Sequence, residues 1–262
     1  MKVDREVGLG EFLGFAASSA LEWEPAEKEA IRAAMRSIEA ALARLSLPLP
    51  PKVLVIKTSG REEGHAAYTR GNAVIFPRRF LEGQGPPLRK FLAHELFHVA
   101  TRGNPALATR LYDAVGFRRC GEVAFPENLA PLKITNPDAP RNDHAIQVKV
   151  GTEMAWAMPI LFSRSRYDAA RGGEFFQYLQ LEFLLVDRCD GKEAPKPLRD
   201  ANGPRRAAVN QVSGFFEQVG SNTQYIIHPE ELLADNFAQI VVGEPPRTPE
   251  IHRRIEAAIA GK

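Results

Sequence analysis

The sequence of 262 residues lacks several features that would define a protein class at once. It has only two cysteines, Cys120 and Cys189, and neither has a Cys-x-x-Cys partner, so a zinc ribbon and a disulfide framework are excluded. We expect two buried free thiols, with a single bridge as the alternative. No internal repeat or low-complexity segment is present, so we expect neither a repeat array nor a fibrous or disordered chain.

An excess of charge of one sign is also missing. Lys and Arg total 34 against 32 for Asp and Glu, which leaves a formal charge of +2. The sequence contains no long run of one sign and no basic stripe with interleaved aromatic residues, so nucleic acid is not expected as a partner. The apolar share of 44% is ordinary for a globular protein that buries a core.

Long hydrophobic runs do not occur either. No stretch reaches the roughly 20 apolar residues that a membrane-spanning helix needs. The first residues carry Asp4, Glu6 and Glu11, where a signal peptide would be basic or apolar. We therefore expect a soluble protein without a membrane span, and the missing signal peptide favours a cytoplasmic location. The oligomeric state is not determined by the sequence.

The first half of the chain alternates between helical and strand-like patterns. The expected elements are a helix over 24–45, a strand over 52–58, two short strands within 65–77, and helices over 87–102 and 105–117. Pro25 suits the first turn of a helix, and Gly103 suits the end of one. A turn at Arg70-Gly71-Asn72 would join the two short strands.

The second half begins with a proline-rich, loop-like segment over 121–143, for which a lid is one hypothesis. Strands are expected within 144–165 and 174–188, and helices over 203–219, 229–242 and 248–260. This order of elements predicts an α+β fold. We expect one unit over 1–262, or alternatively an N-terminal part (1–120), an inserted sheet and loop (121–190) and a helical part (191–262).

The helix over 87–102 contains the order His94-Glu95-Leu96-Phe97-His98. Residues i and i+4 of a helix project from one face, so His94 and His98 could bind one zinc ion. Glu95 is placed to reach a metal-bound water and accept its proton. Chance produces this motif in roughly one chain in a hundred of this composition. Core histidines bonded without a metal are the alternative interpretation.

Apolar residues surround this polar triplet. Leu92, Leu96 and Val99 form a stripe that should face the core. Buried polar side chains need partners, which favours a functional role for the histidines and the glutamate.

A catalytic zinc site also needs a third protein ligand. A metzincin would have glycine and histidine at positions 101 and 104, and Thr101 and Asn104 exclude that class. The helix over 229–242 offers Glu231 and Asp235 at i and i+4. For Glu230 the favoured account is a first-turn acid that favours the helix dipole, and the same account is the alternative for Glu231; Glu153 and His144 are the fallback ligands.

His94-Glu95-x-x-His98 followed by a helical Glu231-x-x-x-Asp235 resembles the gluzincin metallopeptidases, the thermolysin-like group. The resemblance covers two short segments and implies a zincin-like fold, with a small mixed sheet beside the active-site helix and a mainly helical C-terminal part. It implies that Glu231 is the third ligand and that Asp235 accepts a hydrogen bond from His94. It also implies that an edge strand within 65–77 pairs with an extended substrate.

We therefore expect a zinc-dependent metallopeptidase that acts on a peptide or protein, with Glu95 as general base. His144, Tyr225 and His228 are the candidate donors to the oxyanion, although His228 could instead cap a helix. Two alternatives remain: a non-catalytic zinc-stabilised binding protein whose site is closed by a fourth ligand such as His144, and a metal-free α+β interaction domain.

Overall fold

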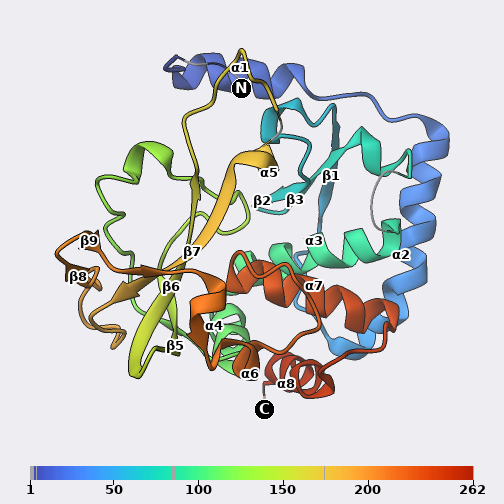
Figure 1. The fold of residues 1–262 in the computed structure, drawn as a ribbon. Helices are drawn as coiled ribbons and strands as arrows, with labels where there is room; N and C mark the ends of the chain where they lie inside the picture. The colour runs from blue at the N-terminus through green and yellow to red at the C-terminus, as the bar shows by residue number, and fades with distance from the viewer. Residues whose placement is uncertain (1–2, 4, 84–86, 174, 262) are drawn as a thin grey trace. The chain divides into compact units, whose positions relative to one another are not determined.

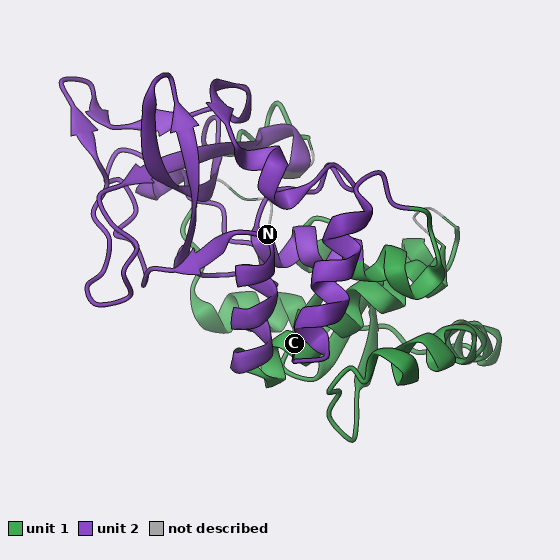
Figure 2. Cartoon of the chain, turned by 90° about the horizontal axis from the view of Figure 1, so that it is seen from below, with its two compact units in different colours: residues 1–105, 167–175, 237–245 green, residues 106–166, 176–236, 246–262 purple. Residues whose placement is uncertain are grey.

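The structure is a computed structural model of an α+β protein (Figure 1), and it describes every residue except 1–2, 4, 84–86, 174 and 262. The chain folds as two compact units (Figure 2). Unit 1 comprises residues 1–105, 167–175 and 237–245, and unit 2 comprises residues 106–166, 176–236 and 246–262. Within the described residues, no helix combines the length and the apolar character that a bilayer crossing requires.

Unit 1 contains a three-stranded mixed sheet and the helices that precede residue 104. Its elements in chain order are α1 (Leu9–Ser18), α2 (Pro25–Leu45), β1 (Leu54–Thr58), β2 (Tyr68–Arg70), β3 (Ala73–Pro77) and α3 (Leu88–Gly103), with 3-10 turns at Arg61–Glu63 and Arg78–Phe80. The strand order is β1-β3-β2, with β1 parallel and β2 antiparallel to β3. The predicted elements before residue 104 are confirmed, whereas α1 was not predicted.

Helix α2 is fixed at both ends by local interactions. Pro25 occupies its first turn, and the Glu27 carboxylate accepts a hydrogen bond from the backbone N–H of Glu24 at 2.9 Å. Ser46 ends the helix in a left-handed conformation with φ of 54°. The buried Lys57 ammonium lies 2.6 Å from the same Glu27 carboxylate, so an ion pair connects β1 to α2.

The β2–β3 hairpin places β2 at the edge of the sheet. Its two-residue turn is Gly71-Asn72, and Gly71 adopts the positive φ of 58° that such a turn favours. Helix α3 packs on this sheet; the rings of Phe91 and Phe76 meet edge to face with centroids 4.8 Å apart. The apolar stripe predicted for α3, namely Leu92, Leu96 and Val99, is buried as expected.

Unit 2 is built on an antiparallel sheet of order β10-β7-β6-β5-β11, with β4 also paired to β5. Its strands are β4 (Phe117–Arg119), β5 (His144–Val150), β6 (Glu153–Ser163), β7 (Leu179–Val186), β8 (Arg199–Asp200), β9 (Gly203–Pro204), β10 (Arg206–Ala207) and β11 (Val212–Ser213). Its helices are α4 (Pro105–Ala114), α5 (Phe175–Tyr178), α6 (Phe215–Val219), α7 (Pro229–Val242) and α8 (Pro249–Ile259), with 3-10 turns at Ala130–Leu132 and Val209–Gln211. Helix α7 belongs to unit 2 up to residue 236 and to unit 1 from residue 237.

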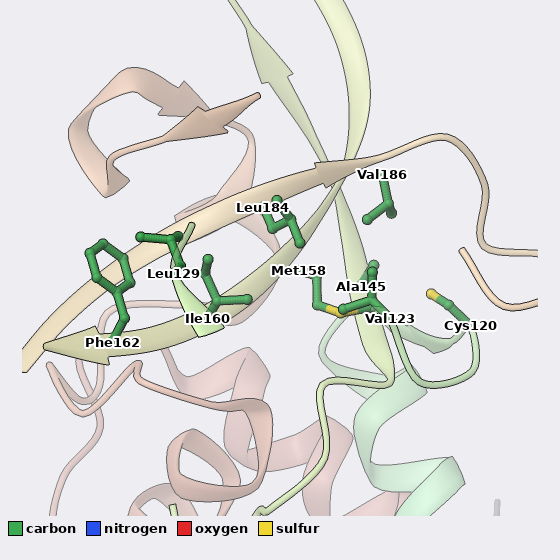
Figure 3. Close-up of a cluster of buried hydrophobic side chains, with 9 residues drawn as sticks. All are labelled: Cys120, Val123, Leu129, Ala145, Met158, Ile160, Phe162, Leu184 and Val186. Atoms are coloured by element: carbon green, nitrogen blue, oxygen red, sulfur yellow. The ribbon is translucent and has the colours of Figure 1, made fainter. Parts of the chain in front are cut away.

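A buried apolar cluster joins the sheet of unit 2 to the segment 121–143. Figure 3 shows its members: Cys120, Val123, Leu129, Ala145, Met158, Ile160, Phe162, Leu184 and Val186. Val123 and Leu129 come from the proline-rich segment and pack beside Met158 and Ile160 of β6. The segment is irregular, as predicted, but its apolar side chains are part of the core.

Two expectations about unit 2 are wrong. Cys120 and Cys189 are joined in a disulfide, with Cα atoms 4.4 Å apart, and are not free thiols. The residues between them include strands β5 to β7 of one sheet. The sheet brings the two cysteines together although they are 69 residues apart in the sequence.

The segment 203–219 is also not one helix, because only α6 is α-helical and a separate 3-10 turn lies at Val209–Gln211. Gly203 and Gly214 adopt positive φ values of 112° and 83°, which interrupt a helix. The short strands β10 and β11 between them pair with β7 and β5. Their apolar residues therefore serve the sheet and not a helical face.

Candidate functional site

Helix α3 brings the two motif histidines together in unit 1. His94 and His98 stand one turn apart on α3, and their Nε2 atoms lie 3.2 Å from each other. The two rings meet edge to face with centroids 4.8 Å apart. Both imidazoles therefore direct the same nitrogen to one point, as two ligands of one ion must.

The separation of these nitrogens fits zinc. Two imidazole nitrogens that bind a tetrahedral zinc ion at about 2.05 Å must lie about 3.3 Å apart. The observed 3.2 Å is close to that value. The same distance also allows one imidazole to donate a hydrogen bond to the other, because a neutral imidazole carries one N–H donor and one acceptor nitrogen. The spacing of His94 and His98 is therefore compatible with two imidazole ligands of one zinc ion.

Glu95 is held by the edge strand β2. Its carboxylate is buried, with 3% of the residue exposed, and its Oε2 accepts a hydrogen bond from Thr69 Oγ1 at 2.9 Å. The carbonyl oxygen of Thr69 in turn accepts a hydrogen bond from Arg102 Nη1 at 2.7 Å. Thr69 therefore connects the glutamate of the motif to the strand beside α3.

The proposed third ligand lies in unit 2, in the first turn of α7. Glu231 is 2% exposed, and its Oε1 accepts a hydrogen bond from Asn136 Nδ2 at 2.6 Å. Its neighbour Glu230 is buried as well and accepts a hydrogen bond from the Tyr112 hydroxyl at 2.5 Å. Neither carboxylate is an exposed first-turn acid, so helix-dipole stabilisation does not account for their burial.

His144 lies in the same part of unit 2. Its Nδ1 is 2.6 Å from Asp143 Oδ1, and its ring packs edge to face on Tyr112 with centroids 4.4 Å apart. Because the Tyr112 hydroxyl binds Glu230, one side chain separates His144 from the first turn of α7. The structure thus connects His144 through Tyr112 to Glu230, the neighbour of Glu231, within unit 2.

Burial controls protonation in this part of unit 2. Burial lowers the pKa of His228 to about 4, so this imidazole is neutral at pH 7. Burial and the Glu230 carboxylate raise the pKa of Tyr112 well above its ordinary value. Burial alone would raise the pKa of Asp143, but the hydrogen bond from His144 and nearby positive charge outweigh it and lower that pKa.

His228 acts as a helix cap. Its Nδ1 accepts a hydrogen bond from the backbone N–H of Glu230 at 3.1 Å, in the first turn of α7. This bond fixes the tautomer, because a nitrogen that accepts carries no proton. The capping role that the sequence left open is therefore present.

The structure gives less support to the other candidate site residues, Asp235, Tyr225 and Glu153. Asp235 is half-buried on α7 and, among the described residues, makes no hydrogen bond or ion pair, so its role beside His94 stays a prediction. Tyr225 is 37% exposed. The side chain of Glu153, the fallback ligand, is 67% exposed and lies 3.3 Å from Arg205. The two residues form a surface ion pair.

Several polar partners were missed by the sequence analysis. Thr69, Arg102, Tyr112 and Asn136 contact the candidate residues only because the fold brings distant segments together. Asn136 starts an Asn-Pro-Asp run, which predicts a turn but does not indicate which residue Asn136 contacts.

Comparison with protein families, with curated proteins and with solved structures gives no match for this chain.

Proposed function

We propose that this protein is a zinc-dependent metallopeptidase of the gluzincin type, in which His94, His98 and Glu231 hold the ion. The observation that carries the proposal is the 3.2 Å separation of the two Nε2 atoms on α3, close to the value that a tetrahedral zinc site needs. A buried glutamate between these histidines in sequence supplies the general base.

The choice of Glu231 is supported by the continuity of α7. In unit 1, the Phe237 ring of α7 packs on the Phe97 ring of α3, with centroids 5.5 Å apart. Glu231 precedes Phe237 by six residues in the same helix, which corresponds to roughly 9 Å along the axis. We take this carboxylate of α7 as the third member of a His-His-Glu ligand set.

The chain's own groups would divide the chemistry as follows. When bound, zinc lowers the pKa of a water and polarises the substrate carbonyl. Glu95 accepts the proton of that water while Thr69 holds one of its carboxylate oxygens. His144, with Asp143 on its Nδ1, donates from Nε2 to the oxygen on which negative charge develops.

The zincin-like part of the proposal concerns unit 1. A small mixed sheet precedes the motif helix, and β2 forms its edge. An extended peptide could add to that edge as a further strand, which would place its backbone beside Glu95. We infer a peptide or protein substrate on this basis.

A second candidate function is a non-catalytic zinc protein with a closed site. Histidine ligands of metals commonly donate the N–H of their other ring nitrogen to a carboxylate, and the Nδ1 of His144 has such a partner in Asp143. His144, held by Asp143, could therefore be a fourth zinc ligand. Catalytic zinc keeps one position open to water, so the two functions differ in what His144 binds.

The deciding experiment is the zinc content of the purified protein together with a peptide-library assay. We expect about one zinc per chain in the wild type, and a much lower content in Glu231→Ala. Glu230→Gln is the matched control, since it changes the adjacent carboxylate and should retain zinc. Glu95→Gln should retain zinc and lose hydrolysis. Absence of zinc from the wild type after incubation with excess metal would refute the proposal.

A further inference from the structure

The segment 121–143 contributes one side chain to the carboxylate of Glu231. Asn136 Nδ2 lies 2.6 Å from Glu231 Oε1, and the asparagine is 8% exposed. An amide that donates to a buried carboxylate offsets part of the cost of its burial and fixes its rotation. The orientation of the proposed ligand is therefore controlled from a loop and not from α7 alone.

The amide of Asn136 is itself oriented by the backbone. Its Oδ1 accepts a hydrogen bond from the N–H of Asp138 at 2.9 Å, in a turn of the Asn-Pro-Asp type. Because the oxygen is used in this bond, the NH₂ group must face Glu231. The turn thus gives Asn136 a single working orientation.

The loop that carries Asn136 is attached to the sheet on both sides of this residue. Two residues earlier, the N–H of Ile134 donates to the carbonyl of Leu161 on β6 at 3.0 Å. The two ends of the segment are joined, because the N–H of Cys120, just before its start, donates to the carbonyl of Asp143 at 2.8 Å. Within the segment, Leu129 packs in the apolar cluster of Figure 3. This anchoring favours a fixed support over a mobile lid.

We propose that Asn136 is a positioning residue that holds Glu231 in the orientation required to bind zinc. The inference rests on the proposed function, because it takes Glu231 as a metal ligand. Groups that hydrogen-bond to metal ligands commonly contribute about 10-fold to 100-fold to metal affinity. Asn136 combines burial, a short contact to the ligand and a fixed amide, which are the requirements for that role.

The test is the zinc dissociation constant of the full chain, measured by competition with a chelator of known affinity. We expect Asn136→Ala to bind zinc about 10-fold to 100-fold more weakly than the wild type. The matched control is Asn142→Ala, because Asn142 lies in the same loop and its amide donates to the carbonyl of Pro159. The control should bind zinc as tightly as the wild type.

A double-mutant cycle separates positioning from collapse of the loop. If Asn136 acts through Glu231, then Asn136→Ala should not weaken zinc binding further in the Glu231→Ala background. Equal zinc affinity of Asn136→Ala and the wild type would overturn the inference, and so would a loss that persists without Glu231. Absence of zinc from the wild type would instead refute the proposed function itself, so the two failures are distinguishable.

Discussion

The hydroxyl of Thr69 lies 2.9 Å from Oε2 of Glu95, and both residues are buried. Thr69 belongs to the edge strand β2 and Glu95 to the motif helix α3, so this bond connects the strand proposed to bind substrate with the proposed base. A hydroxyl that donates to one carboxylate oxygen restricts the rotation of the carboxylate and leaves the second oxygen as the proton acceptor.

Thr69→Val should lower kcat with little change in KM. The variant keeps the shape of the side chain but removes the donor, and a hydrogen bond to a charged group contributes about 1.5–3 kcal/mol, equivalent to roughly 10-fold to 100-fold in rate. Thr69→Ser retains the hydroxyl and should restore most of kcat. Steady-state kinetics on a cleaved peptide, with zinc content as control, provides the measurement. A valine variant as active as the serine variant would show that the bond does not contribute to turnover.

The disulfide should contribute strongly to the stability of unit 2. Cys120 and Cys189 are 69 residues apart in the sequence, and closing a loop of that length in the unfolded chain is worth about 4 kcal/mol in the chain-entropy account. We expect the double change Cys120→Ala and Cys189→Ala to lower the free energy of unfolding by up to that amount. Urea unfolding of the oxidised wild type and of the variant gives the difference. Equal midpoints would contradict the expectation.

Acid should destabilise the protein through His228. Its pKa is lowered to about 4 in the folded chain and lies near 6.5 when unfolded. Below pH 6.5 the unfolded state takes up a proton that the folded state does not, so stability falls as the pH decreases and the loss is complete near pH 4. The full effect is roughly 3 kcal/mol.

His228→Asn tests this pH dependence, because asparagine can still cap α7 but does not titrate. We expect the free energy of unfolding of the wild type to fall more steeply than that of the variant between pH 6.5 and 4.5. The comparison removes the contribution of other acidic groups, which both proteins share. Parallel curves over this range would mean that His228 is not buried in its neutral form.

The sequence was informative where function depends on local spacing. His94, Glu95 and His98 are three residues of one helix, and the periodicity of α3 predicts which face each occupies. Thr69 and Asn136 could not be predicted in the same way, because they lie 26 and 95 residues from their partners. Their contacts depend on sheet register and loop anchoring, which no local pattern encodes.

The wrong helix over 203–219 has a related cause. Its apolar residues fit helical spacing, but pairs such as Ala207 with Phe183 and Val212 with Val150 place them in the sheet. Gly203 and Gly214 were the local warning, since both adopt positive φ. Short strands of two residues carry too little alternation for periodicity to identify them.

His144→Ala should separate catalysis from metal binding. If His144 donates to the oxyanion, its removal should lower kcat by about 10²–10³ and leave zinc affinity unchanged. Tyr225→Phe is the companion variant, because the exposed Tyr225 is the other candidate donor and should have little effect if His144 has this role. The argument for His144 is its contact with Asp143, which occupies Nδ1 at 2.6 Å and leaves Nε2 for donation. A fall in zinc affinity in His144→Ala would identify a fourth ligand and favour the closed, non-catalytic site.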